Sequence, residues 1–155
     1  MRIGQGFDAH RFTDGSEITL GGVIIPHKFA IEAHSDGDVL LHAICDAMLG
    51  AAGLGDIGKN YSDQDSQHKN RNSREFIVDI ANKIQAQNLT VVNIDATVIL
   101  QSPKIASYID EMCQVIANDL KMDVSAVNVK ATTTERMGFV GREEGIAAMA
   151  VVLLQ

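Results

Sequence analysis

Stretches that alternate hydrophobic and polar residues predict the strands of this chain. Residues 2–10 alternate from the start, and after a polar turn residues 18–26 continue as strand, so we expect a hairpin-like opening. Residues 90–100 alternate as in a half-buried strand, and residues 127–135 predict another strand. Residues 145–154 are apolar on both faces, which is typical of a central or interface strand.

A helical period predicts three helices between these strands. The first runs from about residue 37 to about residue 52, begins with Ser and Asp as cap candidates, and ends among glycines. The second covers 73–88 with an apolar stripe, and the third covers 102–122 with Pro103 at its first helical position. Between the first two helices, residues 60–72 are polar without an apolar period and predict a mobile surface loop.

The resulting order is β, α, α, β, α, β, β, without an internal repeat, a low-complexity segment or a linker. This order predicts an α/β fold, a two-layer α+β sandwich in which helices pack on one face of a mixed sheet. A chain of 155 residues has the length of one domain and can bury a core without disulfides. We therefore expect residues 1–155 to form a single domain.

Composition and charge exclude several classes of protein. A hydrophobic fraction of 46% argues against disorder, and a net charge of −7 argues against nucleic acid as a partner. The longest apolar run, residues 146–154, is too short to cross a bilayer, and the first residues lack the features of a signal peptide. Cys45 and Cys113 lie far apart in apolar helical runs, as buried reduced thiols do. We expect a cytoplasmic protein.

A carboxylate and two imidazoles form a candidate metal site. Asp8 and His10 are two residues apart on a predicted strand, so they share one face with Cα atoms roughly 6.5 Å apart. With His42 from the first helix they would give the three N/O ligands of a catalytic zinc site. The alternative is a hydrogen-bonded pair beside a core histidine. Asp38 and Asp46 flank His42 and are either its outer partners or part of a solvated helix face.

Three further segments are candidates for binding phosphate or sugar groups. His34 and Ser35 precede a helix, whose free amides attract anions, although a plain N-cap explains them equally well. Residues 130–145 combine threonines, Glu135, glycines and an arginine, which suits a diphosphate with a divalent ion, but also suits an ordinary hairpin. Asp56 in its glycine-rich turn can hold sugar hydroxyls or simply end a helix.

Taken together, these segments resemble one known family. In this order and spacing, RIGQGFDAHRF, AHSDGDVLLH, GLGDIGK, QSPK and NVKATTTERMGFVGREEGIA are similar to the 2-C-methyl-D-erythritol 2,4-cyclodiphosphate synthases of the non-mevalonate isoprenoid pathway. The match spans nearly the whole chain. Several long motifs that agree at once are far more specific than one Asp-x-His pair, so the resemblance favours the functional interpretation of each segment.

The resemblance implies two kinds of metal ligand. Asp8, His10 and His42 match the family's zinc ligands. Glu135 matches the carboxylate that meets a magnesium or manganese ion on the substrate diphosphate. Two cations at the reacting oxygens would relieve the repulsion between anionic groups, which an acidic protein cannot relieve by its overall charge.

The resemblance also implies catalytic and substrate-binding positions. His34 and Thr133 match residues that orient or stabilise the transferring phosphoryl group, and we expect His34 to act by hydrogen bonding. The positions that match substrate contacts are Ser35, Asp56, Gly58, Tyr61, Asp63, Asp65, Leu100, Lys104, Ala106, Thr132, Thr134, Glu135, Phe139 and Arg142.

The implied reaction converts 4-diphosphocytidyl-2-C-methyl-D-erythritol 2-phosphate to the 2,4-cyclodiphosphate with release of CMP, which makes the enzyme a phosphorus–oxygen lyase. The 2-phosphate attacks the β-phosphorus of the same molecule, so positioning and cations matter more than a general base. The resemblance further implies a homotrimer that shares active sites between subunits. Its central cavity, near Phe7, Arg142 and Glu144, would hold an isoprenoid diphosphate.

One departure and two alternatives complete the sequence-based expectations. Relatives commonly carry Phe-Pro-Asp-x-Asp where this chain has YSDQD at 61–65, and loss of the proline would loosen the loop and affect substrate affinity. The first alternative is a metal-dependent phosphoesterase or nucleotide hydrolase that uses water as the nucleophile and makes a linear phosphate. The second is a non-catalytic trimer that binds isoprenoid diphosphates or nucleotides.

Overall fold

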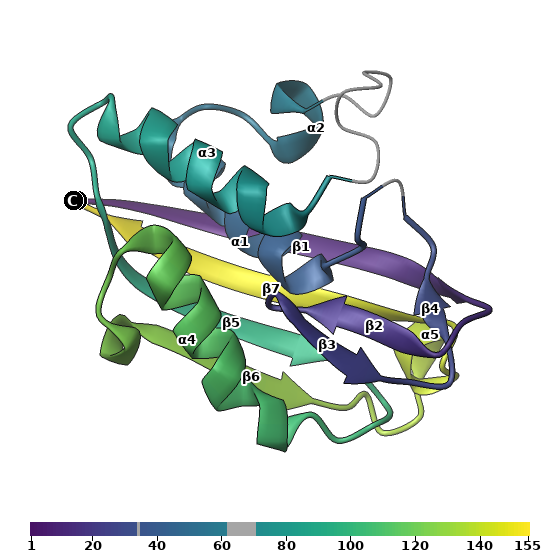
Figure 1. Ribbon diagram of the computed structural model, residues 1–155. Helices are drawn as coiled ribbons and strands as arrows, with labels where there is room; N and C mark the ends of the chain where they lie inside the picture. The colour runs from purple at the N-terminus through teal and green to yellow at the C-terminus, as the bar shows by residue number, and fades with distance from the viewer. Residues whose placement is uncertain (34, 62–70) are drawn as a thin grey trace.

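The fold is built on a five-stranded mixed sheet (Figure 1). A computed structural model describes residues 1–33, 35–61 and 71–155. The strands, in their order across the sheet, are β4 (Ala30–Ile31), β1 (Arg2–Thr13), β7 (Gly145–Leu154), β5 (Val91–Ile99) and β6 (Val127–Thr132). The β5–β6 pair is parallel and the other pairs are antiparallel, so the prediction of a mixed sheet is confirmed. The central position of β7 fits its doubly apolar sequence.

Three long helices cover one face of this sheet, as Figure 1 shows. They are α1 (Val39–Ala52), α3 (Ser73–Gln85) and α4 (Ile109–Leu120). Short helices are α2 (Ile57–Asn60), α5 (Gly138–Gly141) and the 3-10 turns η2 (Ala106–Tyr108) and η3 (Val124–Ala126). α4 lies in the crossover that two parallel neighbouring strands require. The predicted two-layer sandwich with helices on one face is confirmed.

The core lies between α1 and the sheet. Leu40, Leu41, Ile44 and Met48 of α1 are fully buried, because the helix is covered by strands on one side and by α3 on the other. The opposite face of the sheet carries large apolar side chains that the chain itself leaves uncovered. Among them, Ile3 is 72% exposed and Phe7 is 53% exposed, with Met149 and Val151 of β7 beside them.

The predicted hairpin-like opening is wrong in its pairing. β1 pairs with β7 and β4, while β2 (Glu17–Leu20) and β3 (Val23–Pro26) form a separate two-stranded sheet. The reason lies in Gly21 and Gly22, which adopt φ of 59° and 76° and make the tight turn inside the segment predicted as one strand.

The first helix begins at Val39, close to the expected start near residue 37, because Gly37 has φ of 71° and Asp38 is the N-cap. Two other predicted boundaries are wrong. The helix expected to start at Pro103 begins at Ile109, after η2, so Pro103 precedes it in a loop. The strand expected over 127–135 ends at Thr132.

The residues after β6 explain that last boundary. Glu135 and Arg136 have φ of 51° and 64°, a left-handed conformation that cannot continue a strand.

Among the helices of the described residues, none has the length and apolar character needed to cross a membrane.

Candidate metal centre and active site

The predicted metal ligands lie where β1 and α1 approach most closely. Gly4 and Gly6 face α1 from β1, and a Cβ at either position would lie 2.0 Å from a carbonyl oxygen of that helix. Only glycine allows this approach. Asp8 and His10 continue the same face of β1 and therefore also point toward α1, where His42 occupies the first turns of the helix.

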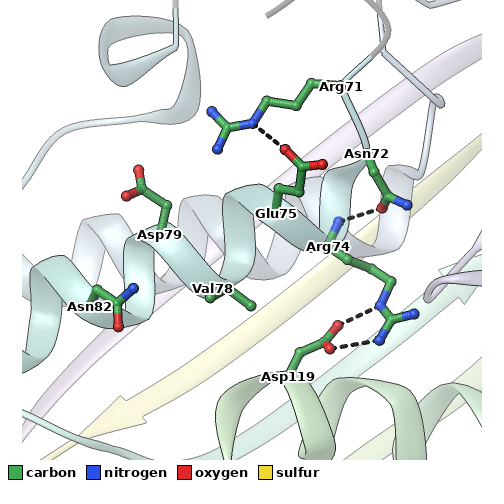
Figure 2. A pocket seen from close by; sticks show the side chains of 8 residues that line it. All are labelled: Arg71, Asn72, Arg74, Glu75, Val78, Asp79, Asn82 and Asp119. Atoms are coloured by element: carbon green, nitrogen blue, oxygen red, sulfur yellow. Dashed lines mark hydrogen bonds and ion pairs between the residues drawn. The ribbon is translucent and has the colours of Figure 1, made fainter.

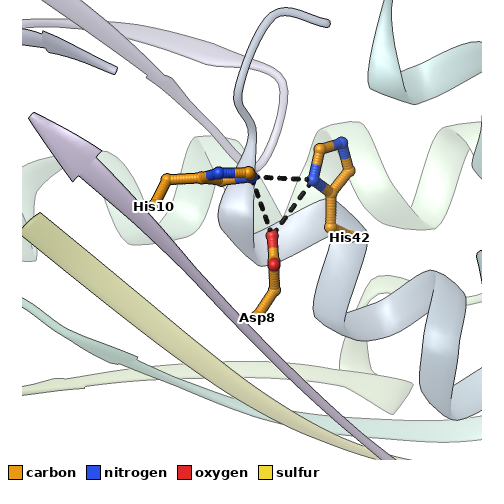
Figure 3. A group of neighbouring side chains, drawn as sticks. All are labelled: Asp8, His10 and His42. Atoms are coloured by element: carbon orange, nitrogen blue, oxygen red, sulfur yellow. Dashed lines mark hydrogen bonds and ion pairs between the residues drawn. The ribbon is translucent and has the colours of Figure 1, made fainter. Parts of the chain in front are cut away.

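Asp8, His10 and His42, which we call the metal group, converge on one point (Figure 3). Asp8 Oδ2 lies 3.0 Å from His10 Nε2 and 3.1 Å from His42 Nδ1, and the two nitrogens are 3.2 Å apart. Within the described parts of the chain, this is the one group of three or more His, Cys, Asp or Glu residues that could hold a metal ion.

The metal group fits a tetrahedral zinc ion. Three ligand atoms at bond lengths of about 2.0 to 2.1 Å from one ion are separated by roughly 3.3 Å in tetrahedral geometry. The observed separations of 3.0 to 3.2 Å are close to these edges. Two imidazoles and one carboxylate are also a donor set that zinc uses in catalytic sites, where a fourth position stays open. Among the described residues the group supplies three ligands, which is the number found in catalytic zinc sites.

The charges of the metal group are coupled. Burial raises the pKa of Asp8, but hydrogen bonds from His10 and His42 outweigh burial and hold this pKa well below its usual value. Burial lowers the pKa of His42, and the hydrogen bond to Asp8 outweighs it, so that the pKa of His42 is raised. The charges of Asp8 and His42 therefore stabilise one another in the absence of a metal.

The two carboxylates that flank His42 along the helix have other partners. Asp38 is fully buried and accepts hydrogen bonds from the amides of Gly21 (2.9 Å), Gly22 (2.7 Å) and Leu41 (3.0 Å). It caps α1 and ties the β2–β3 turn to it. Asp46 accepts from the amide of Ile57 at 2.7 Å, which fixes α2 against α1. Asp38 is therefore a buried N-cap and not part of a solvated helix face, whereas Asp46 is half-exposed; the hydrogen bonds of both go to backbone amides.

A second group of predicted site residues gathers at the ends of β5 and β6. We call residues 100–106 and 132–135 the nucleotide segments, because the resemblance implies that they hold cytidine and phosphates. The amide of Leu100 donates to Thr132 O at 3.0 Å, and the amide of Arg136 donates to Gln101 Oε1 at 3.1 Å. Thr133 Oγ1 donates to Glu135 Oε1 at 2.9 Å.

The side chains of the nucleotide segments are mostly presented to solvent. Exposed members are Lys104, Ala106, Thr132, Thr133 and Glu135, whereas Thr134 is half-buried and Leu100 is buried. This surface offers hydroxyls, an ammonium group and a carboxylate, which are the groups that suit phosphates and a divalent cation.

The metal group and the nucleotide segments stand apart within one chain. Ala9 pairs with Ala147, Ala147 with Ile99, and Ile99 with Thr132, so both groups lie at the same level of the sheet. Three strand spacings of about 4.8 Å separate them by roughly 14 Å. The backbone positions next to the two groups, Ala9 and Thr132, therefore lie on different strands with two strands between them.

The remaining predicted residues lie at two other places. Asp56 is exposed, caps α2 through the amide of Lys59 at 2.8 Å, and adjoins Gly58. Tyr61 is buried, and its hydroxyl donates to Asp79. Phe139 is exposed on α5, and Arg142 pairs with Glu144 at 2.7 Å near the start of β7. The positions of His34, Asp63 and Asp65 fall outside the described residues.

Two contacts of the site were missed by the sequence interpretation. His27, buried at the end of β3, has Nε2 3.0 Å from Ser102 O and so holds the first nucleotide segment. Ser73 Oγ lies 2.9 Å from His42 Nε2. A lone histidine and a serine at a helix start carry no signal for these roles, because both contacts join segments far apart in the sequence.

An open pocket of about 450 Å³ lies between α3 and α4 (Figure 2). Its lining residues differ from all the predicted site residues. The arginines in it are already paired, since Arg71 bonds Glu75 at 2.8 Å and Arg74 bonds Asp119 at 2.7 Å. These charges are used within the protein, so the pocket is a weaker candidate for an anion than the nucleotide segments.

Comparison with solved structures finds the same fold in known synthases. The chain matches a structure of the bifunctional IspDF from Campylobacter jejuni with a TM-score of 0.95 and 46% identity, over 99% of this chain and 42% of that one. A 2C-methyl-D-erythritol-2,4-cyclodiphosphate synthase in a form bound to CDP matches with a TM-score of 0.91 and 30% identity, over 99% of this chain and 100% of that one.

Comparison with curated proteins agrees. The chain is 58% identical to the 2-C-methyl-D-erythritol 2,4-cyclodiphosphate synthase of Pseudomonas putida (strain W619), over 99% of this chain and 98% of the relative. It is 55% identical to the enzyme of that name from Cellvibrio japonicus (strain Ueda107), over 100% of this chain and 98% of the relative. The family description "YgbB family" matches residues 1–155. The chain therefore belongs to the YgbB family, the family of the 2-C-methyl-D-erythritol 2,4-cyclodiphosphate synthases.

Proposed function

We propose that this protein converts 4-diphosphocytidyl-2-C-methyl-D-erythritol 2-phosphate to 2-C-methyl-D-erythritol 2,4-cyclodiphosphate and releases CMP, as a phosphorus–oxygen lyase of non-mevalonate isoprenoid biosynthesis. The observation that carries this proposal is the convergence of Asp8, His10 and His42 within 3.2 Å of one another. Full-length identity of 55 to 58% to enzymes of that name supports it.

The metal group holds zinc in this proposal, and Glu135 meets a magnesium or manganese ion that arrives with the substrate diphosphate. When bound, these cations supply positive charge to phosphoryl oxygens that otherwise repel one another. The protein's own contribution is positioning. The substrate carries nucleophile and electrophile in one molecule, so holding the bent conformer in line supplies much of the rate.

Each side chain then has a role in this proposal. Ser35, whose Oγ lies 3.4 Å from His42 Nε2, holds the phosphoryl group, and His34, which falls outside the described residues, acts on the same group by hydrogen bonding. The exposed hydroxyls of Thr132 and Thr133 donate to phosphate oxygens, with Thr134, Lys104 and the rest of residues 100–106 along the nucleotide. The exposed carboxylate of Asp56, beside Gly58, accepts from sugar hydroxyls. Further substrate contacts in this proposal are Tyr61, Asp63, Asp65, Phe139 and Arg142.

A homotrimer completes this site. The separation of about three strand spacings, roughly 14 Å between the backbones at Ala9 and Thr132, supports a site in which the metal group and Glu135 come from different chains. The nucleotide segments of a neighbouring copy supply the missing half. The uncovered apolar face with Ile3, Phe7, Met149 and Val151 supports such an assembly, because a contiguous exposed apolar surface usually marks an interface.

The same assembly encloses a central cavity. Phe7 supplies apolar surface, and Arg142, whose ion pair with Glu144 lies on an exposed surface, exchanges that partner for the anionic head. An isoprenoid diphosphate matches this combination of an apolar tail and an anionic head. We place the protein in the cytoplasm, with residues 1–155 acting as one catalytic domain.

Phosphorus NMR tests the reaction directly. The purified protein is incubated with zinc, magnesium and the diphosphocytidyl substrate, and His42→Ala serves as the control. Paired cyclodiphosphate signals together with CMP, both absent from the variant, are the expected result. Linear phosphates would favour a hydrolase, and an unchanged spectrum from metal-loaded protein would favour a binding module; either result contradicts the proposal.

A further inference from the structure

The second ring nitrogen of His42 has a defined partner. Nδ1 of His42 points toward Asp8 and His10. Its Nε2 lies 2.9 Å from Oγ of Ser73, which is the first residue of α3. Ser73 is fully buried, so water does not compete for this contact. Ser35 Oγ also approaches Nε2, but at 3.4 Å, and it already accepts from the amide of Gly37 at 3.2 Å. Ser73 is therefore the principal partner of Nε2.

The direction of that hydrogen bond follows from the next residue in line. The hydroxyl of Ser73 donates to Asp36 Oδ1, and the backbone amide of Ser73 donates to Asp36 Oδ2 at 2.9 Å. A carboxylate accepts hydrogen bonds, so the single hydroxyl hydrogen of Ser73 is committed to Asp36. Ser73 Oγ can then only accept from His42, which places a hydrogen on Nε2.

This arrangement decides which nitrogen of His42 can bind a metal. With hydrogen on Nε2, the lone pair lies on Nδ1, 3.1 Å from Asp8 Oδ2 and 3.2 Å from His10 Nε2. The opposite tautomer would aim the Nδ1–H at the metal group. Its Nε2 would then carry no hydrogen to donate to Ser73 Oγ. The row of hydrogen bonds from His42 to Ser73 and from Ser73 to Asp36 follows a general rule: residues that bond the second ring nitrogen of a metal-binding histidine fix its orientation.

The local sequence releases Ser73 for this role. A serine at the start of a helix commonly caps it, but Asn72 is the N-cap of α3 and accepts from the amide of Arg74 at 2.9 Å. Ser73 is left free to join α3 to the segment before α1 through Asp36. The same contact fixes the start of α3 beside the metal group.

We propose that Asp36 and Ser73 are positioning residues that hold His42 as the Nε2–H tautomer and thereby set the zinc affinity of the metal group. This inference rests on the proposed assignment of zinc to Asp8, His10 and His42. It adds to that assignment two residues that touch neither metal nor substrate.

Zinc affinity is the primary test, measured on the full chain by competition with a chromophoric chelator. Ser73→Ala removes the acceptor for Nε2–H and is expected to weaken zinc binding by about 10-fold to 100-fold. Asp36→Asn conserves shape but lets the amide donate to Ser73 Oγ, which turns the serine hydroxyl toward Nε2 and favours the wrong tautomer. A similar loss is expected, and this second variant keeps the test decisive if Ser73→Ala folds poorly.

A matched control separates this effect from the general loss of a serine–aspartate bond. Ser125 Oγ donates to Asp123 Oδ1 at 2.7 Å in η3, on an exposed part of the chain. Ser125→Ala removes that bond and is expected to keep wild-type zinc affinity. Thermal unfolding of all variants in excess chelator reports any loss of stability that does not involve the metal.

A spectroscopic readout distinguishes positioning from simple structural support. In long-range proton–nitrogen NMR spectra of the zinc-loaded wild type, the His42 Nε2–H hydrogen is expected to exchange slowly with water, and in Ser73→Ala it is expected to exchange rapidly.

Wild-type zinc affinity in both Ser73→Ala and Asp36→Asn would overturn the inference, as would an equal loss of zinc affinity in Ser125→Ala. A wild type that binds no zinc would overturn the zinc assignment itself and this inference with it.

Discussion

The metal group and the nucleotide segments occupy the same level of one sheet but are held in different ways. The metal group is half-buried, with side-chain exposures of 25% for Asp8, 22% for His10 and 12% for His42. Close packing of α1 on Gly6 fixes it from within the chain. The nucleotide segments are turned outward, and Glu135 reaches solvent from a left-handed turn. The ligand atoms of the metal group converge within the single chain, whereas the nucleotide segments point to solvent, which is the arrangement expected if a second copy completes the site.

Removing a metal ligand gives the largest expected effect on this comparison. His10→Ala leaves two ligands, so zinc content and CMP release are expected to fall together, the rate by about 10³-fold or more, since metal charge stabilisation is worth several kcal/mol. Metal analysis and a CMP assay on the same preparation check this. Substantial turnover without zinc would contradict the role of the metal group.

Removing the carboxylate of the nucleotide segments is expected to separate the two halves. Glu135→Gln should lower kcat by about 10²-fold, as loss of one electrostatic contact to a transition state commonly does. Zinc content should stay at the wild-type level, because Glu135 is distant from the metal group in its own chain. Glu111→Gln, at an exposed position of α4, is the matched control. Loss of zinc in Glu135→Gln would refute the separation.

Opening the contact between β1 and α1 is expected to damage the metal group through the fold. A Cβ at position 6 would lie 2.0 Å from Ala43 O, so Gly6→Ala pushes α1 away from β1. We expect a loss of about 1 to 3 kcal/mol in the free energy of unfolding, together with weaker zinc binding. Gly50→Ala in α1 is the control. A Cβ at position 50 would have its nearest atom 4.0 Å away, so this variant should be neutral or slightly stabilising. Denaturant unfolding with and without zinc measures both effects; equal results for the two variants would contradict the packing argument.

The pH dependence of zinc binding gives the smallest expected effect. The raised pKa of His42 means that its proton stabilises the zinc-free fold below the unfolded pKa of 6.5, and that this contribution disappears as the pH rises through the folded pKa. Zinc must displace that proton. Apparent zinc affinity is therefore expected to rise on the order of tenfold from about pH 6 to about pH 8. Chelator competition at both pH values measures it, and affinity that is flat or falls with pH would contradict the coupling.

The sequence predicted the metal group better than the nucleotide segments. Asp8 and His10 share a face because of the strand period alone, and the helix that carries His42 was evident from its pattern. The β2–β3 hairpin was missed because Gly21 and Gly22 interrupt a run of otherwise strand-like residues. The separation of the two halves depends on strand order, which a single sequence does not encode locally.

Contacts between segments far apart in the sequence could not be predicted from local patterns, for the same reason. Ser73 and His27 gain their roles from tertiary packing, against His42 and Ser102 respectively. Tyr61, assigned to substrate by resemblance, has its hydroxyl held by Asp79 of α3. The resemblance identified positions, but the physical surroundings of each position required the fold.

Subunit complementation tests the central claim, that one active site is built from two copies of this chain. His10→Ala disables the metal group and Glu135→Gln disables the nucleotide segments. Co-expression of the two variants with different tags allows mixed trimers to be isolated. In each mixed trimer isolated through both tags, one site of the three combines an intact metal group with an intact Glu135 from its neighbour, so about a third of wild-type CMP release is expected. No recovery in verified mixed assemblies, or full activity of an isolated monomer, would contradict the account.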